Sequence, residues 1–162
     1  GQYIPTAQQV ADQAEISIRT VFRHFTEMEH LYKELNEALR PSYEKYFVNH
    51  DLTGSVEQRV ERLIQTRIIG YKEAYHIIRS SQTLFWRSKV LTETYLKNQK
   101  LLRTLLLEML PELNDKGESV IQMADALTSF EVFDRYFWYQ ELTIEECSQL
   151  LLTQLKQLLD VK

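Results

Sequence analysis

Apolar side chains recur along the chain at intervals of three and four residues, the spacing of one face of an α-helix. Stripes of this kind run over residues 28–39, 56–78, 102–109, 123–130 and 147–158. No segment alternates between apolar and polar residues as a half-buried strand does. Glycine and proline are scarce, at 4 and 3 residues, so few turns are expected. The pattern predicts an all-α fold of two short helices followed by about six longer ones.

Capping boxes indicate where several helices begin. In a capping box, a hydroxyl side chain and a glutamate or glutamine three residues later bond each other's free backbone N–H groups. The segments that begin at Thr6, Thr26, Ser55 and Thr143 have this form, and Ser17 is a further candidate cap. We expect loops over 49–54 and 111–117. Pro41 lies inside a helical pattern, so it is expected to kink or split that helix.

The composition is that of a globular protein. The 162 residues suffice for a hydrophobic core, and 44% of them are apolar while 26% are charged. The longest apolar runs, such as 105–107, are far too short to cross a bilayer, so no membrane partner is expected. The single cysteine, Cys147, excludes a disulfide scaffold and a thiolate-rich metal site. It fits the reducing cytoplasm, where we expect the protein, and we expect Cys147 itself in the core.

Charge is unevenly distributed along the chain. The net charge is −2 over residues 1–35, +4 over 36–110 and −6 over 111–162. An acidic C-terminal third is not expected to contact nucleic acid. The chain has no serine elbow, no glycine-rich phosphate loop and no zinc-type cysteine and histidine spacing, so neither an enzyme nor a cofactor is predicted.

The segment 6–25 predicts two short helices joined by a turn. Ala11 and Ala14 are small where such helices would cross closely. Three apolar residues are expected to be buried, namely Ile16 in the turn and Val21 and Phe25 on the second helix.

The outer face of the second short helix is predicted to be positive. Arg19, Thr20 and Arg23 lie together on that face with His24 beside them, and no acidic residue interrupts residues 17–25. A helix of this kind fits the major groove of DNA, where guanidinium groups reach phosphates or guanine edges. A plain helical hairpin with solvated arginines produces the same pattern, and that alternative stays open.

The residues VADQAEISIRTVFRHF, followed by TEMEHLYKEL, resemble the DNA-binding region of the tetracycline-repressor (TetR) family of bacterial regulators. The matching positions are Thr6, Val10, Ala11, Ala14, Ile16, Ser17, Thr20, Phe22, His24, Phe25 and Leu31. The aromatic-rich and leucine-rich segment 127–159 resembles the part of that family that forms a dimerising four-helix bundle. The resemblance implies a helix-turn-helix DNA-binding domain over 1–40 and a helical regulatory and dimerisation domain over 41–162.

The resemblance also implies a function. The chain would be a homodimeric repressor of a double-stranded DNA operator, joined through residues 118–160 and released by a small, largely apolar ligand. Thr6 would lie near a phosphate at a helix N-terminus. The residues implied to contact DNA are Thr6, Ser17, Arg19, Thr20, Phe22, Arg23 and His24.

Three departures from the family pattern affect these expectations. Glu15 stands where the family usually has glycine, and a left-handed conformation there would cost on the order of 1 kcal/mol. Met28 stands where a lysine commonly contacts phosphate. The family's first helix would have to precede Gly1, so we expect the natural protein to begin some tens of residues earlier.

Aromatic residues are the candidate ligand contacts. Ten of them lie on helices expected to form the sensor core. The predicted ligand contacts among them are Tyr71, Tyr75, Trp86, Phe130 and Phe133. The polar tips of the two tyrosines would orient a largely apolar ligand. Plain core packing is one alternative, and a place in the dimer interface is another for Phe133, Phe137 and Trp138.

Two functions of other classes stay open. Two Glu-x-x-His pairs with two further glutamates match the donor set of a di-iron helical bundle: Glu27 with His30, Glu73 with His76, Glu108 and Glu131. The other possibility is a regulator that has lost DNA binding and acts through protein contacts.

Overall fold

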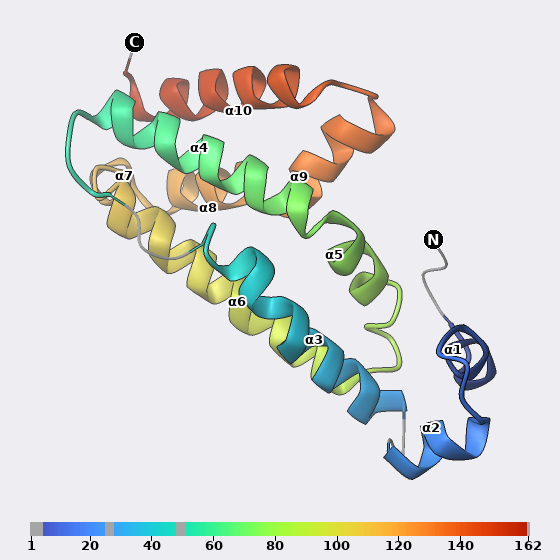
Figure 1. The fold of residues 1–162 in the computed structure, drawn as a ribbon. Helices are drawn as coiled ribbons and strands as arrows, with labels where there is room; N and C mark the ends of the chain where they lie inside the picture. The colour runs from blue at the N-terminus through green and yellow to red at the C-terminus, as the bar shows by residue number, and fades with distance from the viewer. Residues whose placement is uncertain (1–4, 25–27, 48–50, 162) are drawn as a thin grey trace. The chain divides into compact units, whose positions relative to one another are not determined.

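The computed structural model describes residues 5–24, 28–47 and 51–161, and every regular element in these ranges is a helix (Figure 1). The all-α prediction is confirmed for this part of the chain, which contains no strand. In chain order the elements are α1 (Ala7–Gln13), α2 (Ile18–His24), α3 (Met28–Glu44), α4 (Val56–Glu73), α5 (Tyr75–Gln82), α6 (Lys89–Met109), α7 (Leu113–Lys116), α8 (Glu118–Leu127), α9 (Phe130–Asp134), the π-helical turn η1 (Arg135–Tyr139) and α10 (Ile144–Leu159).

The chain divides into two compact units, each built from two separate stretches of sequence. The first unit comprises Gly1–Tyr43 and Ala74–Asn98, and the second comprises Glu44–Glu73 and Gln99–Lys162. The first therefore contains α1, α2, α5 and nearly all of α3, the second contains α4 and α7 to α10, and α6 contributes to both. The predicted domains, 1–40 and 41–162, were defined by function, and that division stays a prediction.

Three of the four predicted capping boxes are confirmed. Both reciprocal bonds are present at Thr6 in α1 and at Thr143 in α10. Before α4, the N–H of Gln58 donates to the Ser55 hydroxyl at 3.3 Å, and the N–H of Ser55 donates to the Gln58 side chain at 3.0 Å. The predicted box at Thr26 lies outside the described residues. Each box satisfies two backbone donors that a helix start would otherwise leave free.

At two predicted interruptions the structure has more helix than expected. α3 runs through Pro41 to Glu44, so it is not split there, and a kink at Pro41 stays a prediction. A helical proline removes one backbone hydrogen bond, and only three residues of α3 follow this one, so the loss is confined to the end of the helix. The predicted loop over 111–117 contains the single turn α7, because Leu113 is fully buried there and its N–H donates to the Leu110 carbonyl at 3.1 Å.

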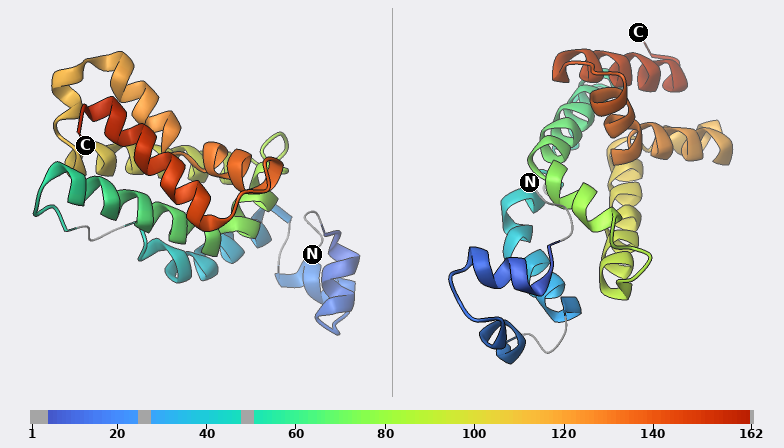
Figure 2. Two further views of the ribbon diagram at one scale, coloured as in Figure 1. Left: turned by 90° about the horizontal axis from the view of Figure 1, so that it is seen from above. Right: turned by 90° about the vertical axis from the view of Figure 1, so that its right-hand side faces the viewer.

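The core of the second unit includes a leucine stripe on α10, which runs beside α4 (Figures 1 and 2). Cys147, Leu151 and Leu155 are buried as predicted, whereas Leu159 rather than Leu158 completes the stripe. The observed residues follow strict four-residue spacing, which keeps their side chains on one helix face. Burial also raises the pKa of the Cys147 thiol, so this side chain stays protonated and packs as a small apolar group.

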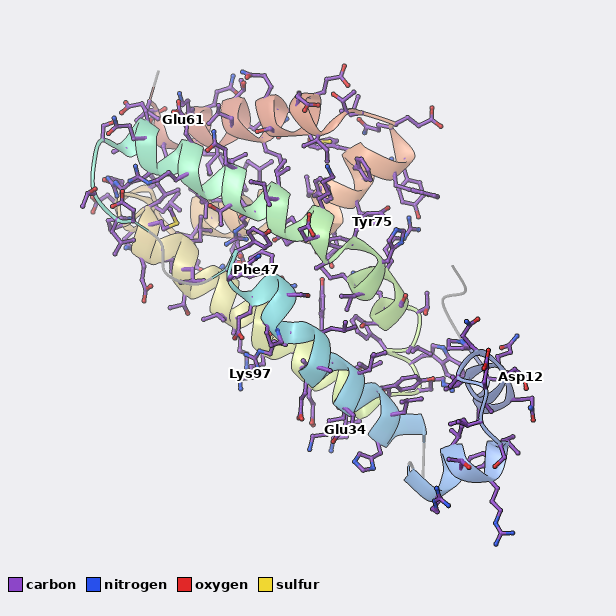
Figure 3. All side chains as sticks on the ribbon, in the orientation of Figure 1. Asp12, Glu34, Phe47, Glu61, Tyr75 and Lys97 are labelled. Carbon is purple, nitrogen blue, oxygen red and sulfur yellow. The ribbon has the colours of Figure 1, made fainter. Side chains whose placement is uncertain are left out.

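A glycine in α4 provides the space for an aromatic ring from the segment after α3. A Cβ atom at Gly70 would lie 2.5 Å from Cζ of Phe47, closer than such atoms can approach. The Phe47 ring, labelled in Figure 3, also lies 5.6 Å from the ring of Tyr71, centroid to centroid. Only glycine fits at position 70 while Phe47 keeps this place.

We expect Gly70→Ala to lower the free energy of unfolding, because displacing the Phe47 ring with the added methyl group costs about 1–3 kcal/mol. The better helix propensity of alanine, about 1 kcal/mol, offsets only part of this cost. Urea unfolding followed by circular dichroism measures the change. Adding Phe47→Leu to Gly70→Ala removes the clashing ring atoms and should recover part of the loss. No recovery would show that the ring is not the obstacle.

A partly buried ion pair joins α4 to Glu112, the N-cap residue of α7, just after the end of α6. The Arg59 guanidinium donates to the Met109 carbonyl at 2.7 Å and forms a bidentate ion pair with the Glu112 carboxylate. The hydrogen bonds from Arg59 lower the pKa of the Glu112 carboxyl. A carboxyl whose pKa is lower in the folded state than in the unfolded state stabilises the folded state at pH values above the unfolded pKa. This stabilisation is lost as the pH falls through the folded pKa of Glu112.

Glu112→Gln is therefore expected to lower the free energy of unfolding near neutral pH and to change it little in acid, where Glu112 is protonated in the parent protein as well. Urea unfolding at a series of pH values measures this. Asp115→Asn is the control, because it removes an exposed carboxylate nearby for which the structure records no ion pair. An equal deficit at all pH values would contradict the assignment.

Candidate DNA-binding helix pair and aromatic core

The turn between α1 and α2 has a left-handed residue at Glu15, with φ 54°. The N–H of Ile16 donates to the Ala11 carbonyl at 3.0 Å, and that of Glu15 donates to the Asp12 carbonyl at 3.2 Å. This pair of bonds is the Schellman arrangement that closes many helices, in which glycine usually occupies the left-handed position. The left-handed conformation that is costly for a residue other than glycine is therefore present, and Glu15 adopts it.

Burial between α1 and α2 is confined to one crossing point. Ala11 and Val21 are 0% and 2% exposed, as predicted. Ile16 is 42% exposed and Ala14 is exposed, so the predictions of a buried plug and of a second crossing residue are wrong. Because α1 and α2 have only seven residues each, the pair buries a single contact between them and leaves the turn exposed to solvent.

The side of α2 away from Val21 carries two exposed arginines. Arg19 and Arg23 are one helical turn apart, and neither forms an ion pair with a described residue. Ser17 caps this helix, because the N–H of Thr20 donates to its hydroxyl oxygen at 3.1 Å. The hydroxyl oxygens of Ser17 and Thr20 are 2.9 Å apart and share a hydrogen bond, which holds both at the start of α2.

An apolar stripe lies beside the arginines on α2. Ile18 and Phe22 are 38% and 49% exposed and lie four residues apart. Phe22 was among the predicted DNA contacts, whereas Ile18 was not. The four-residue spacing between Ile18 and Phe22 could have identified Ile18, since residues with this spacing share a helix face.

Acidic side chains of the helix pair lie on α1 and in the turn. Asp12, labelled in Figure 3, lies on α1 and accepts a hydrogen bond from Gln8 at 2.7 Å. Glu15 follows in the turn. Positive charge is thus restricted to α2, where no acidic residue occurs.

The other predicted residues of this region are described only in part. Thr6 is exposed at the start of α1, and its hydroxyl oxygen accepts the N–H of Gln9. His24 ends α2, but its side chain and that of Met28 are outside what the structure describes, as is the whole of Phe25.

Glu15→Gly should raise the stability of the α1–α2 pair by about 1 kcal/mol, because glycine adopts a positive φ without the steric penalty of a Cβ atom. Amide hydrogen exchange of α1 and urea unfolding both report the change. Ala14→Gly is the matched control, since Ala14 has φ −85° and gains nothing from glycine. A similar response of the two variants would contradict the strain at Glu15.

Three of the five predicted ligand residues meet in the second unit. The Tyr71 ring lies 5.6 Å from Phe130 and 5.8 Å from Phe133, between centroids, and Phe133 stacks on Phe137 at 5.4 Å. Tyr71, Phe130 and Phe133 are each at most 2% exposed. We call these three residues the aromatic core.

A buried polar contact adjoins the aromatic core. Arg67, one turn before Tyr71 on α4, is 4% exposed. Its guanidinium donates to the Thr128 carbonyl at 2.9 Å, and the Tyr71 hydroxyl donates to the same oxygen at 2.8 Å. Burial raises the pKa of Tyr71, so its hydroxyl keeps the donated proton. Sequence analysis missed Arg67, although a charged residue inside the apolar stripe of α4 was a usable signal.

The other two predicted ligand residues belong to the first unit. Tyr75 is 5% exposed at the start of α5 (Figure 3), where its hydroxyl accepts a hydrogen bond from Arg79 at 2.9 Å. Trp86 is 80% exposed in the turn before α6 and so lies neither on a helix nor in a core. Within the second unit, the structure thus brings together three of the predicted ligand residues, Tyr71, Phe130 and Phe133.

Metal-binding side chains do not gather in the described ranges. There, no three histidine, cysteine, aspartate or glutamate side chains lie close enough to hold a metal ion. Of the predicted donor pairs, Glu73 and His76 are both exposed, and Glu27 lies outside the described residues. The Nε2 atom of His30 lies 3.4 Å from Oε1 of Glu34.

Comparisons of the chain with known protein families, with curated proteins and with solved structures found no match. None of the helices described above is both long and apolar enough to cross a lipid bilayer.

Proposed function

We propose that the chain is a sequence-specific DNA-binding regulator of transcription, and that α1 and α2 are its helix-turn-helix motif. The observation that carries the proposal is the outer face of α2, where Arg19 and Arg23 are exposed and without carboxylate partners among the described residues. The resemblance of residues 6–31 to the TetR family supports the same function. Four residues separate the two helices, a length that helix-turn-helix motifs use.

In this proposal α2 enters the major groove. Arg19 and Arg23 donate hydrogen bonds to phosphates or guanine edges. Phe22 contacts the DNA backbone or a thymine methyl group beside them. The hydrogen bond between the Ser17 and Thr20 hydroxyl groups fixes the positions of both, so both are already in place to contact DNA.

The proposed protein acts as a homodimer through α8 and α10. Met123 of α8 and Leu150 of α10 are 56% and 38% exposed. Around them the exposed positions of both helices are largely uncharged, and the centre of a protein interface is likewise depleted of charged residues. Exposed uncharged neighbours include Ser119, Gln122, Ala126, Gln149, Thr153 and Gln157. Two α2 helices must then lie about 34–36 Å apart to reach successive major grooves.

The proposed ligand binds at the aromatic core and releases the DNA. It acts by favouring a dimer in which the two α2 helices no longer match the spacing of the operator. Such a ligand shifts the equilibrium only as far as its affinities for the two arrangements differ.

Selection of random duplex DNA at fixed, near-physiological salt tests the proposal. We expect enrichment of a palindrome by the parent protein and loss of that enrichment in the Arg19→Ala/Arg23→Ala variant, with dimerisation unchanged. The salt concentration is fixed because phosphate contacts alone bind DNA without sequence preference.

The matched control is Lys97→Ala/Lys100→Ala, which removes the same charge from exposed positions of α6. If both double variants lose enrichment equally, net charge rather than α2 explains DNA binding. If the parent protein and the variants all enrich nothing, the DNA-binding proposal is wrong.

One observation favours a second candidate, a regulator that acts through protein contacts. Ile18 and Phe22 expose apolar side chains on one face of α2, and Ile16 exposes another in the turn before it, as a protein-binding surface would. The same selection separates the two candidates, because this alternative predicts no enriched sequence.

A further inference from the structure

Two arginines of α4 are buried, and only one of them faces a carboxylate. Arg59 forms its ion pair with Glu112. Arg67 is the more deeply buried of the two, at 4% against 9% exposure, and it bonds only uncharged oxygen atoms. These are the Leu102 carbonyl at 2.6 Å, the Thr128 carbonyl at 2.9 Å and the Tyr71 hydroxyl at 3.4 Å. In the described ranges no carboxylate forms an ion pair with Arg67, and Asp125 and Glu131 act on the neighbouring Tyr71 hydroxyl only through their charge, Asp125 being paired with Arg103.

A buried guanidinium with uncharged partners attracts an anion strongly. Burying a charge is costly unless an opposite charge compensates it, and the attraction between charges grows as water is excluded. Thr128 ends α8, so its carbonyl carries part of the negative end of the helix dipole. Because a helix end carries only about half an elementary charge, this partial charge does not by itself balance the full charge of Arg67.

We propose that the ligand of the aromatic core is an apolar carboxylic acid, and that Arg67 and Tyr71 bind its carboxylate. This inference rests on the proposed ligand-regulated function and names the chemical class of the ligand. The apolar body of the acid packs among Phe130 and Phe133, and their rings move apart to admit it. The carboxylate accepts the hydrogen bonds that Arg67 and Tyr71 now donate to the Thr128 carbonyl. Charge-assisted bonds of this kind are about twice as strong as those to a neutral acceptor, and this gain opposes the cost of leaving the buried Thr128 carbonyl without its two donors.

The exchange changes the junction between α8 and α9. Thr128 is the C-cap of α8, and the next residue, Ser129, caps the start of α9. When the carboxylate takes the two donors, the Thr128 carbonyl is released from α4. A ligand bound in the core thereby alters the path of the helix that carries Phe130 and Phe133.

The test uses two acid–amide pairs, naphthalene-2-carboxylate with naphthalene-2-carboxamide and dodecanoate with dodecanamide. Isothermal titration of the full chain near neutral pH measures each affinity. We expect each acid to bind about tenfold more tightly than its amide, the difference between a charged and a neutral hydrogen-bonded group. Acetate, which has the carboxylate without the apolar body, should bind far more weakly than either acid.

Variants assign the preference to Arg67. Arg67→Gln should abolish it, and Arg67→Lys, which keeps the charge, should retain part of it. Arg59→Gln is the matched control, since it removes the other buried arginine of α4 and should leave the preference intact. If Arg67→Gln does not fold by circular dichroism, Tyr71→Phe tests the same site, because it deletes one donor and should reduce the preference.

Four results would overturn the inference: no binding of either acid, equal binding of acid and amide, a preference that survives Arg67→Gln, or acetate binding as tightly as the larger acids. The DNA selection is read separately. Enrichment of a palindrome without an acid preference would support the DNA-binding proposal and contradict the carboxylic-acid ligand. An acid preference without an enriched palindrome would support the carboxylic-acid ligand and contradict the DNA-binding proposal.

Discussion

One carbonyl oxygen, that of Thr128, accepts hydrogen bonds from both Arg67 and Tyr71, and much of the second unit depends on this contact. Arg67 also donates to the Leu102 carbonyl in α6, so a single side chain of α4 joins α6 and the end of α8. A buried donor that loses its partner costs roughly 1–3 kcal/mol, more when it is charged. The contact therefore anchors the end of α8 to α4, and Ser129 caps α9 directly after it.

The helix that follows this junction divides its aromatic residues between core and surface. α9 places Phe130 and Phe133 against Tyr71 and then continues as the wider turn η1. Phe137 stacks on Phe133, whereas Trp138 and Tyr139 are 53% and 63% exposed. π-Helical turns of this kind are frequent at functional sites. The aromatic-rich segment is thus both the wall of the aromatic core and a source of exposed surface.

Local signals in the sequence predicted local structure well. The boxes at Thr6 and Thr143 depend on residues three positions apart, and the stripe from Cys147 to Leu155 depends on helix geometry alone. Contacts between distant segments were not predictable in this way. The partners of Arg67 lie on α6 and α8, and nothing in the sequence around Arg67 names them. The helical turn at Leu113 likewise depends on a core that the loop-like residues around it do not reveal.

Sequence also could not separate exposed from buried residues in the short elements. Ile16 resembles a buried residue by its chemistry alone, yet the two short helices are too small to cover it. Trp86 was grouped with other aromatic residues by composition, and its place in an exposed turn could be seen only in three dimensions.

The fit between Phe47 and Gly70 also bears on how this protein can change over evolutionary time. A larger residue at position 70 is acceptable only in a chain whose position 47 has already become smaller, because the space available to one is occupied by the other. The order of substitutions is therefore constrained, with position 47 changing first. Among descendants of this sequence the two positions should covary, although they are far apart along the chain.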